Sequence, residues 1–181
     1  TKLQRESAQL SAASARRRRA FASKIRATER AVLSDSNPDL TNLYRTVAAD
    51  VESVILRLYE HRRNHDQAHY YGVRNVWNDD SATWTNVERA AAFVYLNKTC
   101  FNGLWRVNRA GEFNVPMGSY KNPRICAPDE LRAAAAVLQR VDVRCVDYRV
   151  AVADAERGDF MYFDPPYDSV SATSFTSYTA D

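Results

Sequence analysis

Residues 158–170, GDFMYFDPPYDSV, carry the side chains whose types and spacing best suit chemistry. The apolar residues 160–163 are predicted to form a strand buried on both faces of a parallel sheet. Asp164 then falls at its carboxyl end, where open α/β sheets bind ligands. Neither of the next two prolines has an N–H, and each fixes its φ near about −65°, so their carbonyls stay free and rigidly aimed. These oxygens and the tyrosine ring can receive a flat group that bears an NH₂. The candidate catalytic residues are Asp164, Pro165, Pro166 and Tyr167.

Such a receptor suits methyl transfer onto an amino nitrogen. An amine conjugated with a ring is a poor nucleophile because its lone pair is delocalised. Hydrogen bonds from its protons to strong acceptors favour a tetrahedral nitrogen, which frees the lone pair and stabilises the attacking geometry. Neither a metal ion nor a covalent nucleophile is required for this step. In an arbitrary protein the same four residues are as readily a rigid turn with a capping acid, so the surrounding sequence decides between the two interpretations.

Composition narrows the class of protein. A chain of 181 residues forms one domain, or one domain and a small lobe, and 45% hydrophobic residues exclude a disordered chain. A net charge of +3 says little about partners, so local charge clusters matter more. The three cysteines lack any CxxC pairing and are interpreted as free thiols, not as a zinc site. No apolar run approaches the about 18 residues of a membrane span, so we expect a soluble cytoplasmic protein that does not contact membranes.

The hydrophobic pattern predicts an α/β protein in which strands and helices alternate around an inserted hairpin. Residues 64–86 are polar with scattered aromatics and receive no element. Asp39 is a candidate cap for the first long helix. The predicted elements are a strand at 31–33, one amphipathic helix over 40–63, a helix over 87–96, a hairpin with its turn at 110–111, a helix over 127–141, a strand over 141–148, a short helix over 151–158 that Gly158 ends, and the strand 160–163.

The segment YLNKTCFNGLWRVNRAGEFNVPMGSYKNP, with SDSNPDL before it and GDFMYFDPPYD after it, resembles the DNA adenine methyltransferase family (Dam-like branch, class D12, DPPY motif). The resemblance extends from about residue 27 to the end, with the motifs in the family's order. It implies a partial Rossmann-like sheet of an S-adenosylmethionine-dependent methyltransferase with an inserted helical and β-hairpin region that recognises DNA. The implied division is an atypical Ala/Arg-rich helical segment at 1–30, a catalytic core at 31–63 and 126–181, and a target-recognition region at 64–125.

The same resemblance assigns the cofactor site. The DPPY residues would hold an adenine that is flipped out of double-stranded DNA while S-adenosylmethionine methylates its amino group, because the reacting atoms cannot meet inside a base stack. Asp35 matches the acid that receives the ribose hydroxyls of the cofactor. Asp147 matches the acid that binds its adenine, with Tyr148 beside it, and Asp164 completes the site. The alternative for Asp35 and Asp147 is a loop cap.

The hairpin segment resembles the family's target-recognition region, since cations alternate there with aromatic rings. Cations neutralise phosphates, and an arginine fork can read guanine in the major groove. Phe101 and Asn102 match the wedge at the flipped base, whereas Leu104 and Arg106 match the base readers, and a GATC-like site is expected. The candidate DNA-binding residues are Lys98, Phe101, Asn102, Leu104, Arg106, Arg109, Lys121 and Arg124. For Trp105 and Phe113, a place in the hairpin core is favoured over base stacking.

The segment SARRRRAFAS, residues 14–23, stands where the family carries a glycine-rich cofactor loop. Arginines cannot form that tight turn, so the run is interpreted as a solvated helical charge patch or a nonspecific nucleic-acid contact.

A frameshift is a further hypothesis for the arginine run, because CGG-type arginine codons become GGC-type glycine codons after a shift of one base. Compared with the family, the sheet is expected to be incomplete at both ends, and the alternatives for the chain are an excerpt, a degenerate copy or one half of a split enzyme with a complementary fragment. The alternative functions are a noncatalytic DNA-binding remnant or partner subunit, and a methylase of cytosine or RNA, against which the hairpin argues.

Overall fold

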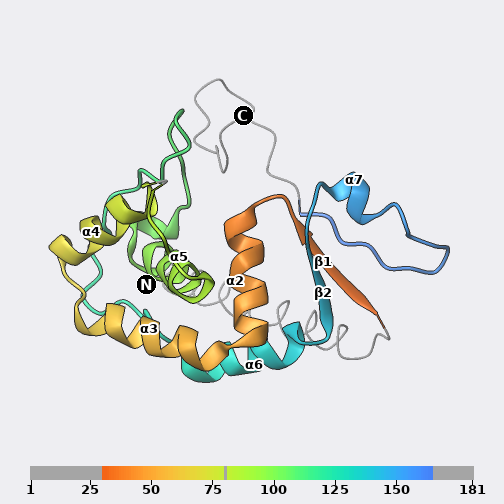
Figure 1. Cartoon of the computed structure of the whole chain (residues 1–181), viewed down its shortest axis with the longest axis horizontal. Helices are drawn as coiled ribbons and strands as arrows, with labels where there is room; N and C mark the ends of the chain where they lie inside the picture. The colour runs from red at the N-terminus through yellow and green to blue at the C-terminus, as the bar shows by residue number, and fades with distance from the viewer. Residues whose placement is uncertain (1–29, 80, 165–181) are drawn as a thin grey trace, which may run out of the picture.

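The computed structural model of the chain describes residues 30–79 and 81–164. Within these residues the fold is mixed α/β, as the sequence predicts, with a two-stranded parallel sheet beside a group of helices (Figure 1). The segment predicted as an Ala/Arg-rich helix lies outside the described residues except for Arg30. The elements are, in order, β1 (Ala31–Asp35), α2 (Pro38–Ala49), α3 (Val51–Arg63), α4 (Gln67–Trp77), α5 (Asn86–Thr99), the 3-10 helix η1 (Phe101–Gly103), α6 (Pro128–Leu138), β2 (Val141–Cys145) and α7 (Tyr148–Ala151).

The two strands pair in parallel, in a register that runs from Ala31 opposite Val141 to Asp35 opposite Cys145. Both were predicted from the sequence, although β2 ends at Cys145 and the expected strand residue Tyr148 begins α7 instead. Helix α2 lies between the sheet and α5, so it connects the strands to the rest of the helices (Figure 1). Because the strands are parallel, their carboxyl ends lie at one edge of the sheet.

The single helix expected over residues 40–63 was wrong, because two helices meet at Asp50. The backbone of Asp50 is not helical, with φ −150° and ψ 70°, and its side chain accepts a hydrogen bond from the Ser53 N–H at 3.1 Å. Asn37, not Asp39, caps the first helix by accepting from the Asp39 N–H at 2.9 Å. The apolar spacing continues through the break, so only the capping preference of the aspartate signalled it.

Helix α4 occupies part of the segment to which the sequence assigned no element. Asp66 caps it by accepting from the His69 N–H at 2.7 Å. Its buried residues Tyr70 and Trp77 are seven positions apart and therefore lie on one face. The apolar stripe is this narrow because most other residues of the helix are polar or exposed, which is why the period was missed.

The hydrophobic core lies on the helical side of the molecule. Leu58 on α3, Tyr70 on α4 and Tyr95 on α5 are fully buried, whereas no residue of either strand is buried to that degree. Helix α5 packs against α2, α3 and α4. The predicted catalytic and recognition regions therefore share one core, and the sequence boundary between them stays a prediction. Throughout the described residues, every helix is too short or too polar to cross a membrane.

The expectations for residues 151–164 were wrong in two respects. The short helix ends at Ala151, and turns follow it up to Gly158, which adopts a φ of +110°. Residues 160–163 form no strand, and Phe160 and Phe163 are 69% and 52% exposed. A strand inside a parallel sheet needs cover on both faces, and the side chains of residues 160–163 are exposed instead. Apolar composition alone therefore does not produce a strand here.

Candidate active site and nucleic-acid interface

Two of the predicted cofactor acids lie at the carboxyl edge of the sheet. Asp35 is the last residue of β1, and its Oδ1 accepts a hydrogen bond from the Asn37 N–H at 2.7 Å. Asp147 follows β2 by two residues and caps α7, with its Oδ1 accepting from the Arg149 N–H at 2.9 Å. Each acid therefore does act as a loop cap. Among the described residues neither Oδ2 atom has a hydrogen-bond partner, so each carboxylate keeps one oxygen for a ligand.

Tyr44 on α2 lies close enough to this edge for Asp35 to act on it, a neighbour that the sequence did not signal. Burial, and then the negative charge of Asp35, raises the pKa of the Tyr44 phenol. Its hydroxyl therefore stays neutral. The two strand ends are also tied together, because the Ser34 hydroxyl donates to the Val146 carbonyl at 3.0 Å.

Asp164 is the last described residue of its segment and is exposed. The preceding residue, Phe163, packs edge-on against Tyr148, with 6.1 Å between ring centroids. Since Tyr148 follows Asp147 directly, this contact brings the start of the DPPY motif toward the same edge (Figure 1). The three other candidate catalytic residues, Pro165, Pro166 and Tyr167, lie outside the described residues.

The predicted wedge projects from the turn after α5. Phe101 and Leu104 are 48% and 52% exposed, and Asn102 between them adopts a left-handed conformation with φ 54°. Asparagine is one of the few residues that tolerate this conformation. The turn is anchored, because the Phe101 N–H donates to the Pro116 carbonyl at 2.8 Å. Two exposed apolar side chains are thus held on a fixed turn.

The predicted hairpin is confirmed by antiparallel pairing of Val107 with Phe113. At its tip, the Asn108 Oδ1 accepts from the N–H groups of Ala110 and Glu112 at 2.9 and 3.0 Å. This arrangement presents Arg109, which is exposed, at the tip.

Arg106 lies on the first strand of the hairpin. Its Nε donates to the Asn114 Oδ1 at 2.9 Å across the hairpin. No other hydrogen bond of its guanidinium is formed within the described residues, so the two terminal NH₂ groups are available to acceptors. Of the three other candidate cations, two are exposed and one is paired. Lys98 is exposed in the last turn of α5, Lys121 is exposed after the hairpin, and Arg124 pairs with Glu130 at 2.7 Å.

Trp105 and Phe113 belong to the hairpin core, as the sequence favoured. Phe113 is 1% exposed, and the Trp105 ring lies 4.5 Å from it and 4.3 Å from Phe93, centroid to centroid. Trp77 of α4 packs edge-on against Trp105 at 5.4 Å. These rings fix the hairpin on the helices and are not available to stack on bases.

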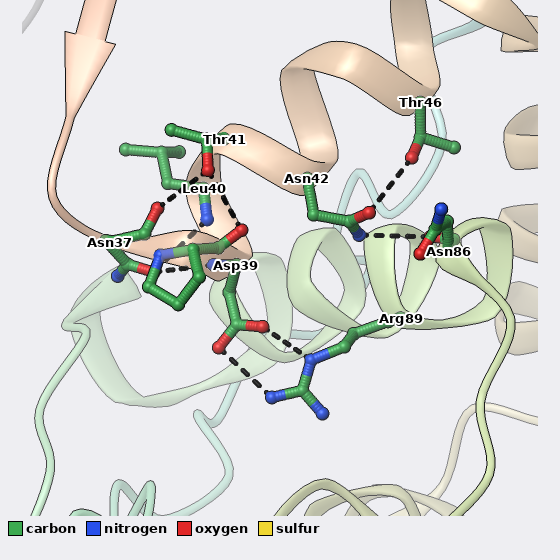
Figure 2. Close-up of polar contacts among 9 residues, drawn as sticks. Asn37, Asp39, Leu40, Thr41, Asn42, Thr46, Asn86 and Arg89 are labelled. Atoms are coloured by element: carbon green, nitrogen blue, oxygen red, sulfur yellow. Dashed lines mark hydrogen bonds and ion pairs between the residues drawn. The ribbon is translucent and has the colours of Figure 1, made fainter. Parts of the chain in front are cut away.

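A polar contact joins the acid edge to the recognition region, and no sequence pattern signalled it. Figure 2 shows Asp39, in the first turn of α2, paired through both carboxylate oxygens with Arg89 of α5, at 2.5 and 3.2 Å. The Arg89 guanidinium also lies 4.3 Å above the Trp77 ring. Nearby, the Asn42 amide donates to the Asn86 carbonyl at 3.1 Å (Figure 2). The helix that follows Asp35 is therefore held directly against the helix that leads into the wedge.

An acid ends β1, another follows β2 by two residues, and a hairpin that presents arginines lies beside them, an arrangement typical of the class of α/β proteins that bind a ligand at the edge of the sheet. The model of the D12 class N6 adenine-specific DNA methyltransferases matches residues 19–181. The chain therefore belongs to this family, which confirms the resemblance drawn from its motifs.

Curated relatives agree with this assignment. The chain is 40% identical over 162 residues to the Type II methyltransferase M.MjaIII of Methanocaldococcus jannaschii, covering 83% of this chain and 55% of the relative. It is 39% identical over 153 residues to the Retron Ec67 DNA adenine methylase of Escherichia coli, covering 83% and 51%. It is 38% identical over 160 residues to the DNA adenine methylase of Vibrio cholerae, covering 84% and 55%. The chain thus spans about half the length of the curated relatives that it matches.

Proposed function

We propose that this chain provides the cofactor edge and the target-recognition region of an adenine-specific DNA methyltransferase. The reaction is transfer of a methyl group from S-adenosylmethionine to the exocyclic amino group of adenine in double-stranded DNA, at a GATC-like site, in the cytoplasm. In this proposal β1 and β2 are part of a Rossmann-like sheet. The observation that carries it is that Asp35 and Asp147 lie at the carboxyl ends of two paired strands, while Phe163, the residue before the DPPY motif, packs against Tyr148.

The donor set at this edge fits the cofactor. The free Oδ2 atoms of Asp35 and Asp147 can accept from ribose hydroxyls and from an adenine amino group, respectively. The Tyr148 ring, 56% exposed, offers an apolar face beside Asp147. When bound, S-adenosylmethionine supplies an electrophilic methyl group.

Asp164 is assigned to the target adenine. Its exposed carboxylate can accept a hydrogen bond from the amino group, which favours the tetrahedral geometry that attack requires. Pro165, Pro166 and Tyr167 are assigned to the same task by their match to the motif, as carbonyl acceptors and a stacking ring.

The recognition region is assigned to the duplex. Phe101 and Asn102 sit on the projecting turn and would fill the place of the flipped base, with Leu104 beside them. Because Asn114 holds the Nε of Arg106, the two NH₂ groups of Arg106 form a fork that can donate two hydrogen bonds to guanine. The remaining candidates would neutralise phosphates: Lys98, Arg109, Lys121 and Arg124.

Calorimetric titration with S-adenosylmethionine, with and without a GATC-containing duplex, tests the proposal. Micromolar cofactor binding and methylation of the duplex are the expected results. One observation favours a second candidate, a noncatalytic DNA-binding remnant or a subunit that needs a complementary fragment: four arginines stand in place of the family's glycine-rich loop. Duplex binding without any cofactor binding would support that candidate and contradict the first.

A further inference from the structure

Helix α4 presents three polar side chains at intervals of four residues, namely Tyr70, Arg74 and Asn78 at its carboxyl cap. Residues four apart lie on the same face of a helix. All three side chains hydrogen-bond to the backbone of residues 113–115, the second strand of the hairpin. This row of contacts is separate from the acid edge and from the residues assigned to DNA.

Asn78 makes the most specific of these contacts. Its Nδ2 donates to the Phe113 carbonyl at 3.0 Å, and its Oδ1 accepts from the Phe113 N–H at 2.9 Å. One side-chain amide therefore satisfies both backbone groups of a residue that is 1% exposed, as a neighbouring β-strand would. Without it these groups would remain unpaired away from water, which is costly.

The other two side chains act two residues further along the same strand. The Tyr70 hydroxyl donates to the Val115 carbonyl at 3.0 Å, and both residues are buried. The Arg74 guanidinium donates to the same carbonyl at 3.3 Å. The strand is thus held by α4 at two alternate residues, which fixes both its position and its direction.

The opposite side of this strand carries the base-reading arginine. Asn114, between the two clamped residues, accepts from the Arg106 Nε through its side chain and donates its N–H to the Arg106 carbonyl at 3.2 Å. Phe113 pairs with Val107. Any shift of residues 113–115 therefore shifts Arg106 with it.

We infer that Asn78, supported by Tyr70 and Arg74, is a positioning residue for base recognition: it fixes strand 113–115 and thereby holds Arg106 in place against the duplex. This inference rests on the proposed function, since it takes Arg106 as a base reader. Asn78 itself does not need to touch DNA. Its loss should reduce the discrimination between duplexes more than it reduces phosphate-driven binding.

The structure offers a matched control. Asn64 ends α3 as Asn78 ends α4, with nearly the same backbone angles, φ −96° and ψ 6° against φ −88° and ψ 1°. The Asn64 side chain is exposed and makes no hydrogen bond within the described residues. Asn78→Ala and Asn64→Ala therefore remove the same group from the same kind of helix end, and only the first change touches the hairpin.

The first measurement is amide hydrogen exchange, which needs neither cofactor nor DNA. Asn78→Ala should accelerate exchange of the Phe113 N–H at least about 10-fold, because this amide loses its acceptor. Asn64→Ala should leave it unchanged. Equal exchange at Phe113 in both variants and the parent chain would overturn the clamp. Should Asn78→Ala fail to fold, Asn78→Asp keeps the acceptor of the Phe113 N–H but replaces the donor by a carboxylate oxygen that repels the Phe113 carbonyl, so residues 114–115 should be held less firmly and exchange faster.

The second measurement is binding, well below the melting temperature, to a GATC-containing duplex and to one with a single altered base pair. The affinity ratio should fall at least about 5-fold in Asn78→Ala, since a bidentate base contact is misplaced, while the salt dependence stays the same. A merely structural role would weaken both duplexes equally, and that result would overturn the inference. A parent chain that binds neither duplex would instead refute the proposed function, and the specificity role of Asn78 would fall with it. The hydrogen-exchange data would still decide whether Asn78 holds residues 113–115 in place.

Discussion

The recognition side and the sheet edge of this molecule differ in how completely their residues are packed. On the recognition side Tyr95 and Phe113 are 0% and 1% exposed, and the hairpin is held by rings and by side-chain amides. At the sheet edge Phe160 and Tyr148 are 69% and 56% exposed, and the Asp35 and Asp147 carboxylates each keep one oxygen that no described residue uses. The recognition side is therefore stabilised by contacts within the described residues, whereas the sheet edge leaves more of its side chains exposed.

The sharpest test of the sheet edge is Asp164→Ala. Methylation should fall at least about 100-fold, because the variant lacks an acceptor of the reacting amine, while duplex affinity and melting temperature stay nearly unchanged. Initial rates with labelled cofactor and a binding titration measure the two effects. Asp159→Ala is the control, since Asp159 lies on the same segment and its carboxylate, among the described residues, accepts a hydrogen bond from the Glu156 N–H alone. A large loss of duplex affinity in Asp164→Ala would contradict the assignment.

The difference in packing predicts unequal costs for the same substitution on the two sides. Leu58→Ala, in the fully buried core, should lower the free energy of unfolding by about 2–5 kcal/mol. Leu33→Ala, at a half-buried position of β1, should lower it by about 1 kcal/mol, because the Leu33 side chain buries less apolar surface on folding than Leu58 does. Urea denaturation of both variants provides the comparison. Equal costs would show that the sheet is as closely packed as the helices.

The contact between the two sides can be weakened through Arg89. Arg89→Ala removes the two-pronged pair with Asp39 and the cation above Trp77, and should cost about 1 kcal/mol of unfolding free energy. Arg57→Ala is the control, because Arg57 pairs with Glu60 and Glu88 and its side chain is more exposed than that of Arg89, so its removal should cost less. Thermal denaturation measures both. A larger cost for Arg57 would indicate that the Arg89 pair does not join the two sides.

The smallest expected effect concerns pH. Burial, and then the neighbouring charge of His69, lowers the pKa of His61 from 6.5 to about 4. Neutral His61 lies 3.0 Å from the His69 ring nitrogen and stacks on Tyr95. The unfolded chain binds a proton more readily than the folded one between these pKa values. The contribution of His61 therefore leaves stability unaffected above about pH 6.5 and reduces it as the pH falls toward about 4.

His61→Gln isolates this contribution, because glutamine can keep a hydrogen bond to His69 but does not titrate. Its melting temperature should fall less steeply between pH 6.5 and 4 than that of the parent chain, although His65 and His69 also have lowered pKa values through burial. Scanning calorimetry at several pH values measures the slopes. Identical slopes would mean that His61 is not desolvated by its packing on α5.

The sequence by itself determined the elements with strong local signals and the order of the motifs. The strand that ends at Asp35, the helix α5 and the hairpin around Gly111 were all predicted, since period, caps and turn residues are local properties. The motif order also identified the family. The candidate acids Asp35 and Asp147 could be named because their positions match the family's motifs.

Only the tertiary structure decided which of these groups meet. It showed that two helices meet at Asp50, that α4 packs on the core and that residues 160–163 are exposed. These features depend on neighbours that are distant in sequence. The ion pair of Asp39 with Arg89 and the hydrogen bonds between the Asn78 amide and the Phe113 backbone likewise join residues 50 and 35 positions apart. Local preference sets the elements, but contacts between them are set by packing, which no local pattern records.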